Sequence, residues 1–380
     1  MRETPLRKLQ ALGQSLWLDY IRRDLMSSGE LRRLIAQDGL RGITSNPAIF
    51  EQSIDGSDDY DEDIRTMALQ GKDAMVIYEA LSQRDVQRAA DEFRHLYDST
   101  DAADGYVSLE VNPHLAHDTR GTIEEARRLW AALNRPNVLI KVPATTEGLI
   151  AIRELTREGI SINVTLLFGL PRYRKVAEAY IAGLEARAAQ GEPLRYVASV
   201  ASFFVSRIDQ FVDPLLEQCI ERGGKQAESA SKARGQVAIA IAKGAYQIYR
   251  EIFGGDRFRS LAGKNARPQR LLWASTGAKN PDYADTKYVE ALIGAETINT
   301  IPLETLDAYR DHGDPKARVE ADIEQAGLLL ARLPHLGISI ENVAQRLEDE
   351  GVEKFITPFD RLLAAISDRT RASLPRGISA

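Results

Sequence analysis

The sequence is poor in cysteine and histidine, and it lacks long apolar runs. Its 380 residues include one cysteine, Cys219, and five histidines. A single cysteine excludes an internal disulfide and a zinc site made of several cysteines, and it fits a reducing compartment. No apolar run approaches the roughly 20 residues that cross a bilayer, and the first residues lack the apolar stretch of a signal peptide. We therefore expect a soluble, cytoplasmic protein.

An excess of charge of one sign is also missing. The 49 basic and 55 acidic residues give a formal net charge of −6. This balance offers no general surface for nucleic acid or for an anionic membrane. A local basic pocket for an anionic substrate would not show in it. The oligomeric state is left open.

The sequence contains enough apolar residues to form a large core. They occur in short runs that alternate with amphipathic stretches. Helical periodicity is clear at 122–133 and 171–189. This alternation favours a parallel sheet, and eight such units predict a closed (β/α)8 TIM barrel. The predicted strands are Leu16–Asp19, Leu40–Asn46, Gly105–Val111, Asn137–Pro143, Gly159–Leu167, Leu194–Ser202, Arg270–Ser275 and Thr297–Pro302.

Two segments exceed a minimal barrel. Residues 206–267, between the sixth and seventh predicted strands, contain a helical pattern at Gly235–Phe253. Residues 315–380 form a second helical segment, with apolar stretches at Ala326–Leu333 and Leu362–Ile366. No internal repeat or low-complexity linker separates these parts. We therefore predict one domain over 1–380, with a helical insertion and a helical C-terminal extension.

Several predicted strands carry polar residues on a face that a barrel should bury. Side chains alternate along a strand, so Lys141 shares a face with Leu139, and Asp19 shares a face with Trp17. The same alternation places other polar residues on one face: Ser108 and Glu110, then Ser161, Asn163 and Thr165, then Ser202 with Val200, and Ser275 with Leu271 and Trp273. Because unpaired buried charge is costly, we expect these groups to meet at the barrel mouth.

A lysine on an apolar strand suggests one chemistry in particular. Desolvation of a lysine amine favours its neutral form, which can attack a ketone and form an imine. The imine acts as an electron sink for carbon–carbon cleavage and needs no cofactor. Asp19 could then take the proton from the reacting hydroxyl, while Glu110 and Thr165 hold a water that shuttles protons. Asn46 and Asn163 could bind sugar hydroxyls.

Each of these residues also has a purely structural explanation. Lys141 and Glu110 could form a structural ion pair. Asp19 could cap a helix that follows its strand, and Asn46 before Pro47 could form only a turn. Glu110 could simply end its strand. Ser202 and Ser275 taken alone would be judged structural.

A metal site is the alternative from another class. His114 and His117 follow Glu110 and, with Asp19, could form the carboxylate–histidine centre of a metal-dependent barrel hydrolase. However, Pro113 precedes both histidines, which places them on a loop, and the sequence has no second histidine cluster. A barrel that only binds or regulates is a further alternative, although it would have no need of these polar residues.

Four segments together resemble the transaldolase family, in its longer subgroup. They are GITSNPA at 42–48, NVLIKVPAT at 137–145, GISINVTLLF at 159–168 and VSLEV at 107–111. The first two are family signatures, and the resemblance covers about residues 15–309. It implies that Lys141 forms the imine, that Asp19 is the acid/base, and that Glu110 and Thr165 hold the catalytic water.

The resemblance also implies a binding site for a sugar phosphate. The segment SFFVSR at 202–207 is similar to a family motif in which an arginine binds phosphate, and Arg207 matches it. The family's second phosphate-binding arginine is replaced by Lys279, after Ser275. The implied substrate-binding residues are Asn46, Asn163, Ser202, Phe204, Arg207, Ser275 and Lys279.

The implied reaction moves a dihydroxyacetone unit from sedoheptulose 7-phosphate to glyceraldehyde 3-phosphate, within the non-oxidative pentose phosphate pathway. A simple class I aldolase that splits fructose 6-phosphate would use nearly the same residues. That alternative therefore stays open beside the metal-dependent hydrolase. No metal or cofactor is expected for the leading interpretation.

Overall fold

In the computed structural model, which describes residues 4–373, eight parallel strands close into a barrel in the order β1 to β8. The last strand pairs with the first, Leu16 opposite Asn299, so the sheet has no free edge. The strands are β1 Gln14–Asp19, β2 Leu40–Thr44, β3 Tyr106–Glu110, β4 Val138–Pro143, β5 Ile162–Leu167, β6 Ser199–Phe204, β7 Arg270–Ala274 and β8 Thr297–Ile301. The predicted (β/α)8 barrel is confirmed.

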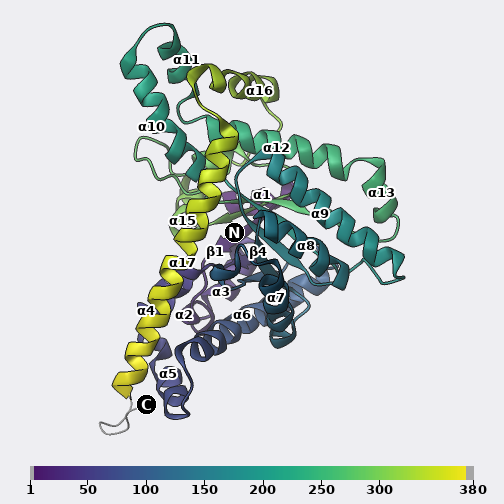
Figure 1. The fold of residues 1–380 in the computed structure, drawn as a ribbon, viewed down its shortest axis with the longest axis vertical. Helices are drawn as coiled ribbons and strands as arrows, with labels where there is room; N and C mark the ends of the chain where they lie inside the picture. Colours follow the sequence, from purple (N-terminus) through teal and green to yellow (C-terminus); the bar gives the residue numbers. More distant parts are fainter. Residues whose placement is uncertain (1–3, 374–380) are drawn as a thin grey trace.

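Helices surround the barrel and connect its strands (Figure 1). Those before β6 are α1 Pro5–Ala11, α2 Arg23–Ser27, α3 Glu30–Arg33, η1 Leu34–Asp38, α4 Pro47–Asp55, η2 Asp58–Tyr60, α5 Asp61–Leu69, α6 Ala74–Ser99, η3 Pro113–Leu115, α7 Thr119–Leu133, α8 Thr146–Glu158 and α9 Leu170–Ala189. Those after it are α10 Ser206–Arg222, α11 Lys225–Ala233, α12 Val237–Phe253, α13 Asp256–Ala262, α14 Lys287–Ala291, α15 Leu303–His312, α16 Ile323–Arg332, η4 Leu333–Leu336 and α17 Ile340–Ser373.

The sixth strand lies later in the chain than predicted. The sequence suggested Leu194–Ser202, whereas β6 is Ser199–Phe204. Leu194 and Val197 are buried, but they belong to a turn in which the Val197 amide donates to the Leu194 carbonyl. Apolar residues in a buried turn imitate the start of a strand, which explains the misplaced boundary.

Both extra segments are helical. Helices α10 to α13 lie between β6 and β7. Helix α12 covers most of the helical pattern expected at Gly235–Phe253, but Gly235 itself has a φ of +70° and lies outside the helix. The C-terminal part forms α16, η4 and α17; residues 374–380 lie outside the described part. Helix α17 runs diagonally along the barrel in Figure 1 and packs on α4, α5, α6, α10 and β5.

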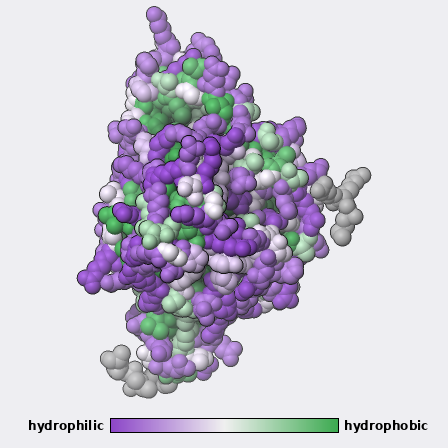
Figure 2. Space-filling view, turned by 90° about the vertical axis from the view of Figure 1, so that its right-hand side faces the viewer, coloured by the Kyte–Doolittle hydropathy of each residue, from purple (hydrophilic) through white to green (hydrophobic). Residues whose placement is uncertain are grey.

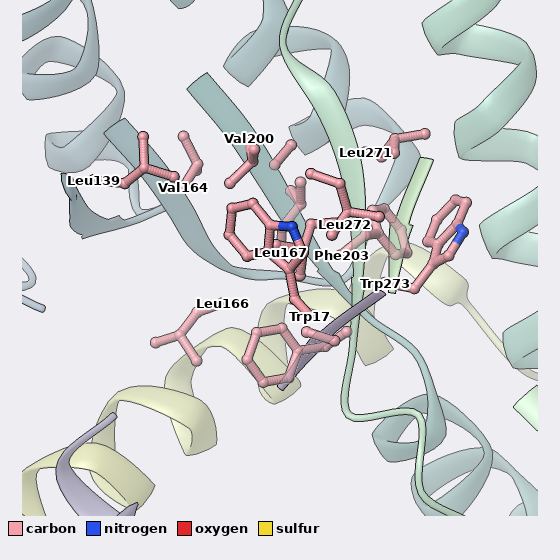
Figure 3. Packing of buried hydrophobic residues seen from close by; sticks show 14 of the residues in the cluster. Trp17, Leu139, Val164, Leu166, Leu167, Val200, Phe203, Leu271, Leu272 and Trp273 are labelled. Carbon is pink, nitrogen blue, oxygen red and sulfur yellow. The ribbon is translucent and has the colours of Figure 1, made fainter. Parts of the chain in front are cut away.

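Aromatic and branched side chains fill the layer between the barrel and its helices. Phe203 on β6 meets Trp273 on β7 edge to face, with ring centroids 6.4 Å apart, and Tyr173 of α9 packs on its other side. The Trp273 indole N–H donates to the Leu292 carbonyl, so its one polar atom is satisfied. Figure 3 shows Phe203 and Trp273 among Leu271 and Leu272. Full burial of one such side chain contributes roughly 1.5–3 kcal/mol.

The surface is mostly hydrophilic, and apolar colour gathers toward the end where Figure 1 places α11 and α16 (Figure 2). Helix α16 buries none of its residues fully, and Leu328 on it is 51% exposed. Among the helices formed by residues 4–373, none is both long and apolar enough to cross a membrane.

Candidate active site

The polar strand ends converge on a pocket at the carboxyl-terminal mouth of the barrel, where barrel enzymes carry their chemistry. The cavity measures about 190 Å³. Its lining residues are Asp19, Thr44, Asn46, Lys141, Thr165, Ser202, Phe204, Arg207, Gln210, Ala274, Ser275, Gly277, Lys279, Thr300, Pro302 and Phe355. Nine of the eleven residues named from the sequence are among them; Glu110 and Asn163 lie behind this lining.

Lys141 lies inside the barrel and is 4% exposed. Alternation along β4 directs it to the same side as Leu139, as predicted. Its Nζ lies 3.4 Å from the Glu110 carboxylate and donates to the Ser45 carbonyl at 3.0 Å. The ion pair considered from the sequence is therefore present, and the same amine lines the pocket. The ion pair with Glu110 therefore does not exclude Lys141 as the reactive group.

Glu110 lies directly opposite Lys141 in the β3–β4 ladder. Burial raises the pKa of Glu110 to about 7, and the neighbouring Lys141 offsets part of that effect. A carboxyl group with such a pKa can both accept and return a proton near neutral pH. The Oε2 atom of Glu110 accepts no hydrogen bond from residues 4–373, so it can still accept one from a bound water or substrate.

Asp19 ends β1 and enters the pocket. It accepts a hydrogen bond of 2.6 Å from the Thr44 hydroxyl, which lies 2.7 Å from the Thr300 hydroxyl. Burial raises the pKa of Asp19, and Lys141 is the largest opposing influence. The helix-cap explanation is wrong, because α2 begins at Arg23 and its N-cap residue is Arg22.

Asn46 has two roles at once. Its side chain accepts from the Ile49 amide at 3.1 Å and so caps α4, a structural role other than the turn considered from the sequence. The same residue lines the pocket. Because the cap uses the amide oxygen, the amide nitrogen is the group left to donate to a sugar hydroxyl.

Asn163 lies beneath the pocket in a small polar network. It is opposite Lys141 in the β4–β5 ladder. Its amide donates to the Ser108 hydroxyl at 3.0 Å, and it accepts from the Ser202 hydroxyl at 2.6 Å. Ser202 lines the pocket while Asn163 does not, so the network orients Ser202 toward the ligand space.

A bulge in β5 shapes the wall that carries Thr165. The pairing with β6 shifts register between Val164 and Leu167, and Leu166 adopts a φ of +56°. Bulges of this kind redirect side chains near active sites. Thr165 faces the pocket, and its hydroxyl has no hydrogen-bond partner within the described chain. That hydroxyl is free for a bound water, as the proposed proton relay requires.

Two further cations line the pocket, Arg207 and Lys279. Arg207, in the first turn of α10, has its guanidinium 5.2 Å from the centre of the Phe204 ring. Burial lowers the pKa of Arg207, and Asp19 and Glu110 oppose this. Its Nη1 makes no hydrogen bond to any described residue, so it is available to an anion. Lys279 follows β7 and lines the same pocket.

Ser275 lines the pocket, as predicted, but the alternation of side chains along β7 is not the reason. Alternation grouped it with Leu271 and Trp273, but Trp273 packs outward against the helix layer. Strict alternation would therefore have turned Ser275 away from the barrel interior. A φ of +54° at Ser275 breaks the alternation and brings it to the lining, with its hydroxyl 3.0 Å from that of Ser206. Such strained backbone is frequent at functional sites.

Sequence reasoning missed four polar or aromatic lining residues: Thr44, Gln210, Thr300 and Phe355. Thr44 ends β2 and Thr300 is the last residue but one of β8, so the alternation rule could have identified them. Gln210 lies one helical turn after Arg207, a spacing that also could have suggested it. Phe355 comes from α17, and no local pattern marks it.

The structure does not bring His114 and His117 to Asp19. Both line a separate groove beside α17, where His114 pairs with Asp360 and His117 with Glu147. His114 lies on the short helix η3 rather than on an irregular loop. Residues 4–373 contain no cluster of three or more histidine, cysteine, aspartate or glutamate side chains arranged to hold a metal ion.

The fold and this pocket define an α/β-barrel protein with a buried lysine at its mouth. A family described as Transaldolase/Fructose-6-phosphate aldolase matches residues 16–366. A transaldolase of Thiobacillus denitrificans is 48% identical over 95% of this chain and 99% of its own, and one of Trichodesmium erythraeum is 46% identical over 97% and 98%. One of Saccharopolyspora erythraea is 44% identical over 96% and 97%. The chain belongs to the transaldolase/fructose-6-phosphate aldolase family.

Proposed function

We propose that this protein is a transaldolase. It moves a dihydroxyacetone unit from sedoheptulose 7-phosphate to glyceraldehyde 3-phosphate through an imine on Lys141, in the cytoplasm and within the non-oxidative pentose phosphate pathway. The observation that carries the proposal is the position of Lys141, whose buried amine lines the pocket together with Asp19 and lies 3.4 Å from Glu110. The family membership supports the same reaction.

Imine formation is the first step. The neutral amine of Lys141 attacks the ketose carbonyl, and the resulting carbinolamine loses water. Proton transfer in this step belongs to Glu110, whose pKa of about 7 suits both directions of transfer. A water held by the free hydroxyl of Thr165 would connect Glu110 to the reacting oxygen.

Carbon–carbon cleavage is the second step. Asp19 takes the proton of the substrate hydroxyl beside the bond that breaks, and that C–O becomes the carbonyl of the departing aldehyde. The electron pair of the broken bond moves into the protonated imine and forms an enamine on Lys141. The raised pKa of Asp19 makes it a stronger base than an ordinary carboxylate once it is ionised. The acceptor aldehyde then reverses these steps.

Substrate phosphate binds at the cationic end of the pocket. Arg207 presents an unoccupied N–H group there, and Lys279 adds a second positive charge. A guanidinium can bind phosphate through two parallel hydrogen bonds, whereas an ammonium acts as a point charge. We therefore assign the stronger and more directional phosphate contact to Arg207.

Borohydride trapping with fructose 6-phosphate tests the proposal directly. Reduction during turnover should leave a three-carbon adduct on the peptide that contains Lys141, detected by mass spectrometry. Lys243 is an internal control, because it is also buried but donates to the Ala321 carbonyl away from the pocket. Absence of an adduct at Lys141, under conditions in which the sugar binds, would refute the mechanism.

A coupled assay separates transfer from simple cleavage. With fructose 6-phosphate and erythrose 4-phosphate, a transaldolase forms sedoheptulose 7-phosphate and little free dihydroxyacetone. Fast release of dihydroxyacetone without an acceptor would instead identify a fructose-6-phosphate aldolase. The Lys141→Met variant should be inactive in both assays while keeping its fold.

A further inference from the structure

The aromatic ring of Phe355 closes the pocket above the reactive amine. Phe355 is 4% exposed and belongs to α17, far along the chain from every barrel strand. Its ring centre lies 5.7 Å from the Lys141 Nζ. It is the one pocket-lining residue that α17 supplies. We propose that Phe355 keeps water and protons from the three-carbon intermediate on Lys141, and so decides that the fragment is transferred rather than released.

Two contacts position the part of α17 that carries this ring. One helical turn before it, Gly351 faces Leu166, so closely that an added Cβ would approach the leucine Cδ2 to 2.9 Å. One turn after it, Phe359 packs edge to face on Tyr78, with ring centroids 5.3 Å apart. These contacts attach α17 to the rest of the protein on both sides of Phe355.

The bulge in β5 links this ring to the proton relay. At the bulge Thr165 faces the pocket, and the next residue, Leu166, turns outward to meet α17. Figure 3 shows Leu166 directed away from Val164 and Leu167, toward the yellow ribbon of the C-terminal helix. A single local distortion thus positions both the water-binding hydroxyl and the helix that supplies Phe355.

The chemistry gives the ring a definite task. After cleavage, the enamine on Lys141 has two fates. In transfer, its nucleophilic carbon bonds to the acceptor aldehyde carbon, and the aldehyde oxygen takes a proton from Asp19. In release, the same carbon takes a proton, one water adds to the imine carbon, and the C–N bond breaks to give free dihydroxyacetone and the amine. Release consumes a water that transfer does not need at this stage.

An apolar ring over the imine slows the second fate more than the first. Excluding water from a closed site prevents hydrolysis of reactive intermediates. This inference rests on the proposed imine mechanism and extends it to the choice between transfer and release.

The Phe355→Ala variant tests the inference. The measured quantity is the rate of dihydroxyacetone release from fructose 6-phosphate divided by the rate of transfer to erythrose 4-phosphate. We expect this ratio to rise about tenfold or more, which corresponds to roughly 1.4 kcal/mol between the two barriers. Phe355→Leu, which keeps an apolar side chain over the amine, should change the ratio much less.

Phe359→Ala is the matched control. It removes the same side chain from the same helix, at a buried position that does not line the pocket. It should lower stability to a similar degree and raise the ratio much less than Phe355→Ala does, because the aromatic ring over Lys141 is kept. An equal rise in Phe359→Ala would show that any loosening of α17 has this effect and would overturn the specific role of Phe355.

Borohydride trapping separates the two levels of failure. If wild type and Phe355→Ala both give the three-carbon adduct on Lys141 but share one ratio, the role of Phe355 is wrong and the imine mechanism stands. If wild type gives no adduct, the proposed function itself fails. A folded Phe355→Ala protein, checked by circular dichroism, with a raised ratio and an intact adduct supports the inference.

Discussion

The chemistry of single residues in this pocket depends on their burial together. Glu110, Asp19 and Arg207 have pKa values shifted toward their neutral forms, and burial is the largest cause for each of them. Opposite charges close by reduce each shift without cancelling it. Of the three, Glu110 has a pKa of about 7 and can exchange protons near neutral pH, which ordinary surface carboxylates do not.

Replacement of Glu110 by glutamine should change the pH dependence of catalysis. In wild type the carboxylate gains a proton as the pH falls through about 7, so kcat/KM should fall on the acid side. Glu110→Gln cannot titrate, and it should lose this acid limb together with about 10²-fold in kcat. Steady-state rates measured across the neutral range test this. An unchanged acid limb in the variant would assign the ionisation to another group.

Replacement of Asp19 by asparagine should stop the reaction after imine formation. The amide oxygen can still accept from Thr44, so the local geometry is kept. Cleavage should slow by about 10²-fold or more. Borohydride should then trap the whole six-carbon ketose on Lys141 instead of the three-carbon fragment. A three-carbon adduct formed at the wild-type rate would move the base function away from Asp19.

At the scale of elements, β5 and α17 act as a pair. The bulge at Thr165 and Leu166 gives α17 its contact surface, and the glycine at 351 lets the helix approach closely. Leu166, which meets α17 at Gly351, adopts a φ of +56°. Strand and helix therefore complete the pocket together.

Filling the contact at Gly351 should therefore move the whole helix. In Gly351→Leu the new side chain meets Leu166, and we expect a loss of about 1–3 kcal/mol in unfolding free energy from overpacking. The ratio of release to transfer should also rise. Gly327→Leu on α16 is the control, because nothing lies within 4 Å of an added Cβ there. Urea unfolding and the two rate assays measure both effects, and equal behaviour of the two variants would contradict this view of α17.

At the scale of the whole molecule, the two ends of the barrel serve different purposes. The amino-terminal end holds a polar cluster centred on Asp104, which lies just before β3. Its carboxylate binds Arg41 at 2.7 Å, Arg270 at 3.2 Å and the Ser15 hydroxyl at 2.9 Å. These partners come from β2, β7 and β1, so the cluster joins distant parts of the closed sheet.

Asp104→Asn should destabilise the fold without altering the chemistry. Breaking a buried ion pair costs about 3–5 kcal/mol, and we expect roughly 2 kcal/mol here because both arginines keep some contact with water. The trapped adduct on Lys141 should be unchanged. Asp98→Asn, which breaks the exposed pair with Arg94, should stay within about 0.5 kcal/mol of wild type. Loss of adduct formation in Asp104→Asn would show that the two barrel ends are coupled.

The sequence by itself determined the barrel and most of the polar set at its mouth. Alternation of apolar runs and amphipathic stretches reports burial directly, so all eight strands were found. A period of two places Lys141 on a definite face. The start of β6 was predicted too early, because the buried turn before it has the same apolar composition as a strand.

Only the tertiary structure decided which distant groups meet. Phe355 reaches Lys141 because α17 folds back across the barrel, and no local pattern encodes that return. Ser275 enters the pocket through a backbone conformation that breaks the period of two. The pKa of about 7 at Glu110 likewise arises from burial beside charges on other strands. Periodicity records the environment of each residue along its own element, whereas contacts between elements depend on packing across the whole chain.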